Sequence, residues 1–123
     1  MKIVLSIKPQ YANEIIHGTK KFEYRKSAAR QKASAIVIYI TSPVKQIAAE
    51  VEILQILKMT PEEMWENTKQ SSGIDKASFD EYFANRKVAY AYQLGKVTEY
   101  TPLKSLSEFG LKSAPRSILY IDK

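Results

Sequence analysis

A lysine, a glutamate and an arginine are spaced so that their side chains can act together. Lys20, Glu23 and Arg25 follow a glycine in the segment Gly18–Arg25 (GTKKFEYR). In an extended strand Glu23 and Arg25 share one face, since they are two residues apart. Arg25 offers a planar donor fork for a phosphate or a base edge, and Glu23 can orient it or accept from an exocyclic amine. Lys20 can meet a phosphate as a point charge, or act as a base if burial lowers its pKa.

Each of these residues also has a purely structural interpretation. Lys20 comes just after a predicted helix, so its ammonium can interact with the last helix carbonyls. Glu23 and Arg25 can form a strand-surface ion pair worth only ~0–1 kcal/mol. We favour the functional interpretation for all three residues and leave the structural one open.

Further candidate ligand-binding residues lie on either side of this segment. Lys8 precedes a helix N-terminus, where backbone N–H groups favour an anion. Tyr11, on the same helix, is a candidate for stacking on a base. In the polar loop that follows the strand, Lys26 and Arg30 are interpreted either as contacts to a nucleic-acid backbone or as part of a solvated charged loop.

The distribution of charge supports a polyanionic partner. The 123-residue chain has a formal net charge of +6, and this charge is unevenly spread. Residues 1–45 carry a net +7, residues 46–85 a net −5 and residues 86–123 a net +4. This asymmetry indicates a surface that faces a polyanion, backed by an acidic one, although basic charge also serves solubility.

Composition excludes several classes of protein. The chain has no cysteine, which excludes disulfides, thiolate zinc sites and a cysteine nucleophile, and His17 is its only histidine. We therefore expect no metal and no cofactor. The 4 glycines are not clustered, so no glycine-rich phosphate loop is present. No apolar run approaches the ~20 residues that span a bilayer, and the apolar stretch at the N-terminus is too short for a signal peptide. We expect a cytoplasmic protein that does not bind membranes.

Periodicity and capping signals predict strands with a few short helices between them. We expect helices over 9–17, from a Thr60 cap to the polar stretch 70–73, and after an Asp75 cap, with a turn or short helix over 103–109. The expected strands cover residues 2–7, 21–26, 35–40, 46–57, 88–100 (with a break at Gly95) and 117–121. There is no regular βαβ alternation. The fold class is therefore α+β, a partly open mixed β-barrel of five to six strands with short inserted helices, forming one domain over 1–123.

The opening of the chain resembles the ASCH (ASC-1 homology) family of the PUA-like superfamily. The resemblance is carried by Leu5–Ala12 (LSIKPQYA) and by the glycine, lysine, glutamate and arginine of the segment Gly18–Arg25. It implies a PUA-like barrel with a cleft beside the first helix, and binding of RNA or nucleotides. Some small members resemble or act as amidohydrolases on acylated cytidine, with a lysine, a threonine and a late glutamate. Lys20 matches that lysine, Glu23 stands in place of the threonine, and Asp75 or Glu66 would have to serve as the third group.

Three hypotheses about function follow. The first is an RNA- or nucleotide-binding domain whose basic cleft is lined by Lys8, Lys20, Glu23 and Arg25. The second is a small hydrolase acting on a modified nucleoside or on RNA, with Lys20 as base and Glu23 or a late carboxylate as orienting group. The third is a protein-interaction module, for which no residue argues positively. The sequence predicts neither the identity of the ligand nor the oligomeric state.

Overall fold

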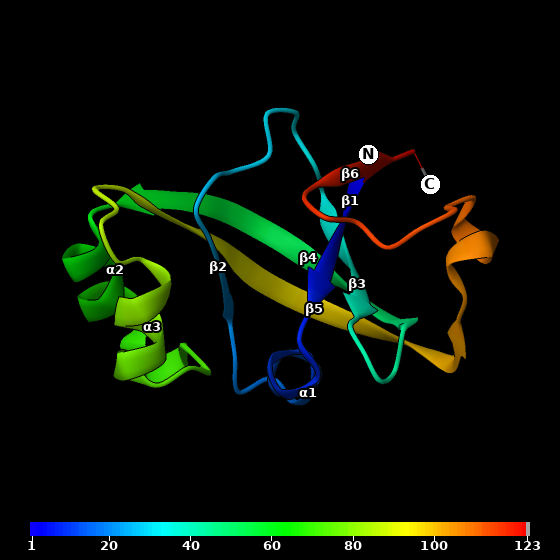
Figure 1. The fold of residues 1–123 in the computed structure, drawn as a ribbon, viewed down its shortest axis with the longest axis horizontal. Helices are drawn as coiled ribbons and strands as arrows, with labels where there is room; N and C mark the ends of the chain where they lie inside the picture. Colours follow the sequence, from blue (N-terminus) through cyan, green and yellow to red (C-terminus); the bar gives the residue numbers. More distant parts are fainter. Residues whose placement is uncertain (123) are drawn as a thin grey trace.

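Six strands form one mixed sheet that curls but does not close. The computed structural model describes residues 1–122. Its strand order is β2-β5-β4-β3-β1-β6, in which β1 and β3 are parallel and the other pairs are antiparallel. The strands are β1 (Lys2–Ile7), β2 (Phe22–Arg25), β3 (Ala35–Ile40), β4 (Gln46–Met59), β5 (Ala89–Lys104) and β6 (Leu119–Ile121). The predicted α+β class and mixed strand arrangement are confirmed, and the partly open barrel of five to six strands that the sequence predicts is a six-stranded sheet that does not close (Figure 1).

Short helices begin and end where the capping signals place them. Helix α1 (Pro9–His17) starts with a proline and stops at Gly18, which has a left-handed φ of 85°. Helix α2 (Pro61–Thr68) begins with a capping box between Thr60 and Glu63. The remaining helical segments are α3 (Lys76–Tyr82) and the 3-10 turns η1 (Lys69–Ser71) and η2 (Leu106–Phe109). None of the helices within residues 1–122 has the length and apolar composition needed to cross a membrane.

The predicted break at Gly95 is wrong. Strand β5 continues through this glycine and ends at Lys104. A Cβ at residue 95 would collide with the Glu52 carboxylate and lie 2.9 Å from a methyl carbon of Leu54 on the neighbouring strand. The glycine therefore leaves room for the side chains of Glu52 and Leu54, at a place where the β4–β5 register shifts. A glycine in a strand marks either a break or a close contact, and sequence alone does not distinguish the two.

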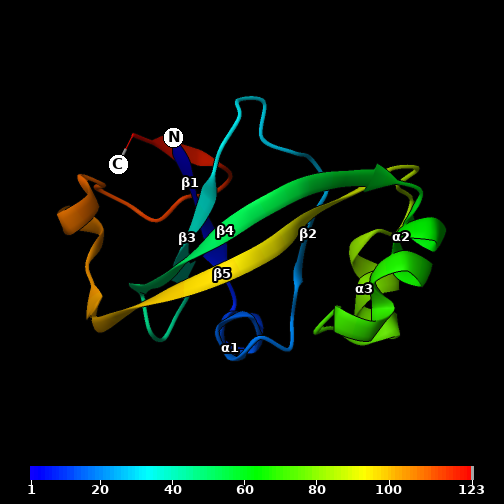
Figure 2. The ribbon, with the colours of Figure 1, turned by 180° about the vertical axis from the view of Figure 1, so that it is seen from behind.

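Two long strands separate the ends of the molecule. Strands β4 and β5 are neighbours in the sheet and run side by side along the length of the molecule, as Figure 2 shows, with α2 and α3 at one end and η2 at the other. The helical insert (residues 61–82) packs on the sheet through a cluster of buried residues: Tyr24, Met64, Phe79, Phe83, Ala89 and Ala91. This cluster fixes α3 opposite the junction of β1 and α1, and the space between them is the candidate site.

Candidate functional site

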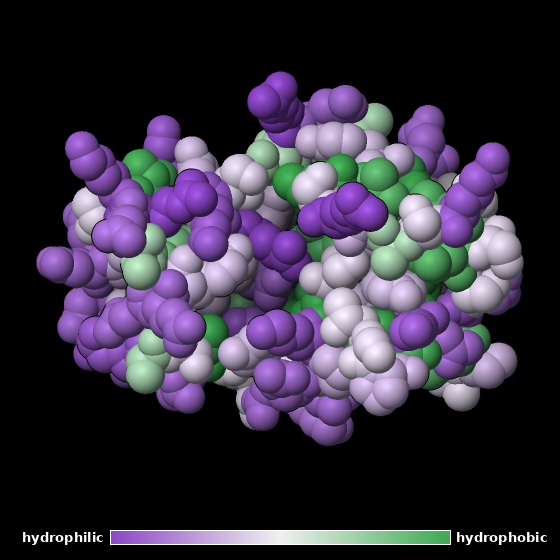
Figure 3. All heavy atoms as spheres, in the orientation of Figure 1, coloured by the Kyte–Doolittle hydropathy of each residue, from purple (hydrophilic) through white to green (hydrophobic). Residues whose placement is uncertain are grey.

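A cleft of about 480 Å³ lies between α3 and the β1–α1 junction, with β2 as its floor. Figure 3 shows a hollow in the middle of this face, with hydrophilic side chains gathered around it. Its lining residues come from three separate parts of the chain: Ser6, Ile7, Lys8, Tyr11, Lys20, Glu23, Tyr24, Arg25, Ile74, Ser78, Glu81 and Tyr82. The volume falls in the range of small-molecule sites, ~300–1,000 Å³.

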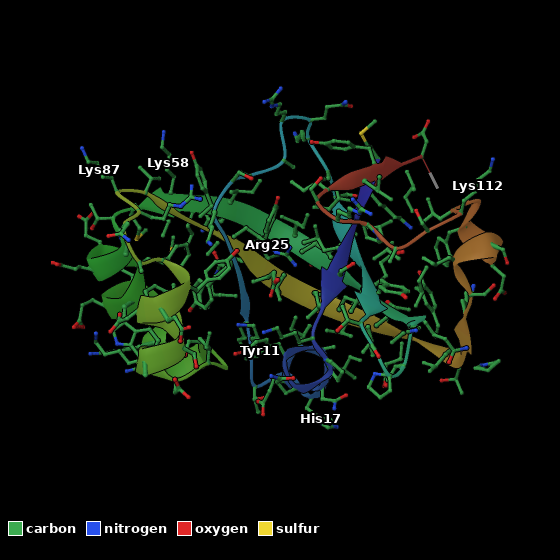
Figure 4. The ribbon with its side chains drawn as sticks, viewed as in Figure 1. Tyr11, His17, Arg25, Lys58, Lys87 and Lys112 are labelled. Carbon is green, nitrogen blue, oxygen red and sulfur yellow. The ribbon has the colours of Figure 1, made fainter. Side chains whose placement is uncertain are left out.

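Five of the residues singled out from the sequence line this cleft: Lys8, Tyr11, Lys20, Glu23 and Arg25. Figure 4 shows Tyr11 and Arg25 in the central region, whereas His17 lies on the outer side of α1. Gly18, which ends α1, lets the chain turn directly into β2. Residues before this turn (Lys8 and Tyr11) and residues after it (Lys20, Glu23 and Arg25) therefore line the same cleft. The structure thus brings these five side chains together, while their roles in binding remain a prediction.

Lys20 is buried at the floor of the cleft, with only 3% of its surface exposed. Its ammonium donates to the Ser72 carbonyl at 2.7 Å and lies 4.6 Å from the ring centroid of Tyr24 and 5.4 Å from that of Tyr11. The structural interpretation assigned the ammonium to the last carbonyls of α1, but it is the backbone N–H of Lys20 that donates to one of them, the Glu14 carbonyl, at 3.0 Å. Burial lowers the pKa of Lys20 from 10.5 to about 8, because desolvation disfavours the charged amine, and the nearby carboxylate of Glu23 only partly offsets this.

Glu23 and Arg25 form the ion pair that their spacing predicts. The Arg25 Nη2 lies 2.8 Å from a Glu23 carboxylate oxygen, and the Nε donates to the same oxygen at 3.0 Å. Arg25 also donates to the Ser6 carbonyl at 3.0 Å, which ties β2 to the end of β1. Because Glu23 is 7% exposed, this is not a surface pair. These contacts use the Nε and Nη2 groups of the guanidinium.

The net charge of the cleft is small. The lining includes three basic side chains, Lys8, Lys20 and Arg25, against the carboxylates of Glu23 and Glu81. One of these carboxylates already neutralises Arg25. The marked basic character predicted for the cleft is therefore not shown, and a ligand that carries both a phosphate and hydrogen-bond donors suits this lining better than a bare anion.

Two other predicted ligand residues lie outside the cleft. Lys26 is exposed, with its ammonium 4.9 Å from the ring centroid of Tyr82 at the rim. Arg30 is exposed on the loop after β2, where its backbone N–H donates to the Tyr120 hydroxyl at 2.8 Å. Their contribution to binding stays a prediction.

Neither candidate for the third catalytic group reaches the cleft. Glu66 lies on the exposed surface and pairs with Lys69, and Asp75 accepts from the backbone of Ser78 as the N-cap of α3. The carboxylate that α3 does present to the cleft is that of Glu81. Glu81 is not among the residues predicted from the sequence, because helical spacing shows on which face of α3 it lies but not what that face meets. Ser78, Glu81 and Tyr82 are related by i,i+3 and i,i+4 steps, and so lie on one face of α3.

Tyr24 serves both the core and the cleft. Its ring makes edge contacts with Phe79 and Phe83, at centroid distances of 5.1 and 6.3 Å. Its hydroxyl donates to Thr68 at 2.7 Å, because the Thr68 hydroxyl in turn donates to the Met64 carbonyl. Burial raises the pKa of Tyr24 to about 12, so the phenol is neutral. The alternation of β2 predicts its core contacts but gives no sign of its second role.

No group of three or more histidine, cysteine, aspartate or glutamate side chains within residues 1–122 could hold a metal ion. The polar groups that line the cleft are amine, guanidinium, carboxylate, hydroxyl and phenol groups, beside the apolar side chains of Ile7 and Ile74. Such groups can bind a phosphate, hydrogen-bond a base edge, stack on a base and transfer protons.

Comparison with known proteins identifies the family. The sequence profile of the ASCH domain matches residues 5–102. The chain belongs to the ASCH domain family. The matched region contains every residue that lines the cleft. The crystal structure of ASCH from Zymomonas mobilis superposes with a TM-score of 0.90 at 22% identity, covering 99% of this chain and 88% of that one. A single-residue variant of the same protein also gives 0.90, at 21% identity with 99% and 91% coverage. The PUA-like fold of this ASCH domain is thereby confirmed.

Curated relatives match nearly the whole ASCH domain at low identity. An "ASCH domain-containing ribonuclease" from Zymomonas mobilis is 24% identical over 127 residues, covering 98% of this chain and 84% of the relative. Two proteins of Ureaplasma parvum also match over 97% of the chain, one named ATP synthase subunit alpha (27% identical) and one named large ribosomal subunit protein uL22 (24% identical). The chain spans only 15% and 39% of the lengths of these two.

Proposed function

We propose that this ASCH domain binds single-stranded RNA and holds one nucleotide of the strand in the cleft. The observation that carries the proposal is the convergence of phosphate-binding and base-binding groups in one hollow. Lys8 and Arg25 offer cationic donors for a phosphate, and the rings of Tyr11 and Tyr82 offer surfaces for a base. The buried carboxylate of Glu23 can accept from a base edge. The relative named as a ribonuclease supports RNA as the class of ligand.

The depth of Lys20 favours an unpaired nucleotide. Its ammonium lies at the floor of the cleft, 5.4 Å from the ring centroid of Tyr11 and 4.6 Å from that of Tyr24, and the exposed fraction of Lys20 is 3%. A base within a duplex is stacked and paired, so it reaches such a floor only by leaving the helix, which costs a few kcal/mol. A single strand avoids this cost, because its bases are already free to turn outward.

Binding is expected to weaken with salt in proportion to the phosphates that are neutralised. If about four phosphates are contacted, the log–log slope of affinity against salt is ~−2.8 for a single strand. Fluorescence anisotropy with a short labelled single-stranded RNA, at salt concentrations below and above the physiological ionic strength of about 150 mM, measures this slope. A flat dependence would refute a polyanionic ligand, and equal affinity for the matching RNA duplex would refute the requirement for an unpaired nucleotide.

Arg25→Lys is expected to reduce RNA affinity by roughly 10-fold or more, which corresponds to ~1.5 kcal/mol for a lost charge-assisted hydrogen bond. The lysine keeps the charge but loses the planar fork that contacts both Glu23 and a ligand. Lys87→Arg is the control, since this exposed residue lies between α3 and β5, away from the residues that line the cleft (Figure 4). Unchanged affinity in Arg25→Lys, measured by the same anisotropy assay, would remove Arg25 from the binding site.

RNA cleavage is a second candidate function, and the state of Lys20 favours it. An amine with a pKa of about 8 is partly neutral near physiological pH and can take a proton from a ribose 2′-hydroxyl. The resulting oxygen attacks the adjacent phosphorus and displaces the 5′-oxygen of the next nucleotide, which takes a proton from water, so that the products are a 2′,3′-cyclic phosphate and a free 5′-hydroxyl. Arg25 is placed to stabilise the charge that develops on the phosphate. The amidohydrolase hypothesis has no such support, since Glu23 stands where a threonine hydroxyl is implied and is paired with Arg25.

A further inference from the structure

We infer that Ser72 and Gly73 are positioning residues: the turn between η1 and α3 fixes the location of the Lys20 ammonium, and any side chain at residue 73 would displace it. The sequence predicts a break between two helices at this place but not its contact with Lys20. The effect of this turn on RNA binding or cleavage rests on the proposed function, whereas its effect on the position of Lys20 does not.

Two hydrogen bonds join this turn to the start of β2. The Lys20 ammonium donates to the Ser72 carbonyl at 2.7 Å, and the backbone N–H of Lys21 donates to the Ser71 carbonyl at 2.9 Å. Within the turn, the Ser72 hydroxyl donates to the Ile74 carbonyl at 3.0 Å. Ser72 is itself 4% exposed, so its carbonyl depends on these contacts rather than on water. The acceptor for the ammonium is thereby held in one place.

Gly73 gives the stem of Lys20 its space. A Cβ at residue 73 would lie 2.6 Å from Cγ and 2.9 Å from Cδ of Lys20, and would also collide with its Cβ. Backbone and stem cannot both stay where they are once that atom is added. Gly73 also has a φ of 62°, a conformation that favours glycine. Two separate effects of a substitution, backbone strain and the collision with Lys20, can therefore be distinguished by experiment.

Displacement of the stem should change the acid–base behaviour of Lys20. Desolvation is the largest influence on its pKa, so movement toward solvent raises the pKa toward the ordinary 10.5. The titratable and charged groups that face the amine or share its cleft are Glu14 and Tyr11 on α1, Glu23, Tyr24 and Arg25 on β2, Glu81 and Tyr82 on α3, and Lys8.

The test compares Gly73→Asn with Gly110→Asn in the full chain. Asparagine tolerates a positive φ better than most residues, and both glycines have one, 62° and 73°. A Cβ at residue 73 would collide with Lys20, whereas no atom of residues 1–122 beyond the glycine and its chain neighbours lies within 4 Å of a Cβ at residue 110. The rate at which acetic anhydride modifies Lys20, followed by mass spectrometry across pH, reports the pKa of the amine. We expect a midpoint near pH 8 for the wild type and Gly110→Asn, and one at least one pH unit higher for Gly73→Asn.

An unchanged midpoint in Gly73→Asn would overturn the inference, and this outcome is independent of RNA because the labelling needs none. Should the midpoint rise while RNA affinity and cleavage stay the same, the positioning role stands and the proposed function fails. If Gly73→Asn does not fold, the double variant Lys20→Gly/Gly73→Asn decides the matter, since it lacks the stem atoms. Recovery of folding in the double variant supports the inference, and failure to fold while Lys20→Gly folds alone refutes it.

Discussion

Replacement of Lys20 by methionine is expected to abolish RNA cleavage and to stabilise the fold at neutral pH. Loss of a general base typically costs ~10²–10⁴-fold in rate. Methionine keeps a similar unbranched shape in the buried stem position but carries no charge, so the cost of burying an ammonium disappears. A residue that lowers stability while supporting activity is the expected signature of a functional rather than a structural lysine.

The pH dependence of this stabilisation follows from linkage. The pKa of Lys20 is about 8 in the folded protein, against the ordinary 10.5 in an unfolded chain. Between these values the unfolded chain binds a proton that the folded protein has released, so wild-type stability rises with pH from 8 to 10.5. The advantage of methionine is therefore greatest below pH 8 and shrinks across that window. Its upper limit is about 3 kcal/mol, reduced because the Ser72 carbonyl loses its donor.

Urea unfolding at several pH values and a gel assay of RNA cleavage measure the two effects of Lys20→Met. Wild-type cleavage should rise about tenfold per pH unit below pH 8 and level off above it, because the neutral amine is the active form. Lys21→Met is the matched control, since Lys21 is the exposed neighbour of Lys20 and does not line the cleft. Retained cleavage in Lys20→Met would refute the role as base, and a loss of stability at pH 7 would show that the lysine is structural.

Phe79→Ala is expected to cost ~3–5 kcal/mol of unfolding free energy, a large part of the stability of a small domain. Phe79 is 1% exposed and belongs to the buried cluster through which the helical insert packs on the sheet. Its ring centroid lies 5.1 Å from that of Tyr24, 5.1 Å from that of Trp65 and 4.9 Å from that of Phe83. Its removal leaves a cavity between α3 and the sheet. Because α3 forms one wall of the cleft, RNA affinity should fall as well.

Chemical denaturation and the anisotropy assay measure these two consequences. Phe79→Leu is the control, because it keeps most of the buried volume and should lose much less stability. A loss below about 1 kcal/mol in Phe79→Ala would mean that the insert does not depend on this cluster. Normal RNA affinity in a variant that has lost the expected stability would remove the α3 wall from the binding site.

Local signals explain why the first half of the fold was predictable. Pro9 sets the first turn of α1 and Gly18 its left-handed end, so both bounds follow from single residues. The motif residues Lys20, Glu23 and Arg25 lie within one turn and one strand, and their convergence follows from the same short segment. At Gly95 the signal was equally local but its cause was a neighbouring strand, and there the prediction failed.

The second wall of the cleft depends on packing between distant segments. Glu81 and Tyr82 reach the site because Phe79 and Phe83 anchor the insert against Tyr24, far away in sequence. A single sequence shows that α3 has a polar face but not which part of the sheet this face meets. For the same reason sequence reasoning assigned Asp75 and Glu66 where Glu81 lies. The contact between Gly73 and Lys20 is likewise a property of the assembled fold.

A crystal structure of the domain with a short single-stranded RNA tests the central claim most directly. The account predicts one nucleotide in the cleft, with its base against the ring of Tyr11 or Tyr82 and a phosphate within hydrogen-bond distance of Arg25 or Lys8. RNA bound to another face, with the cleft between α3 and the β1–α1 junction left empty, would contradict it.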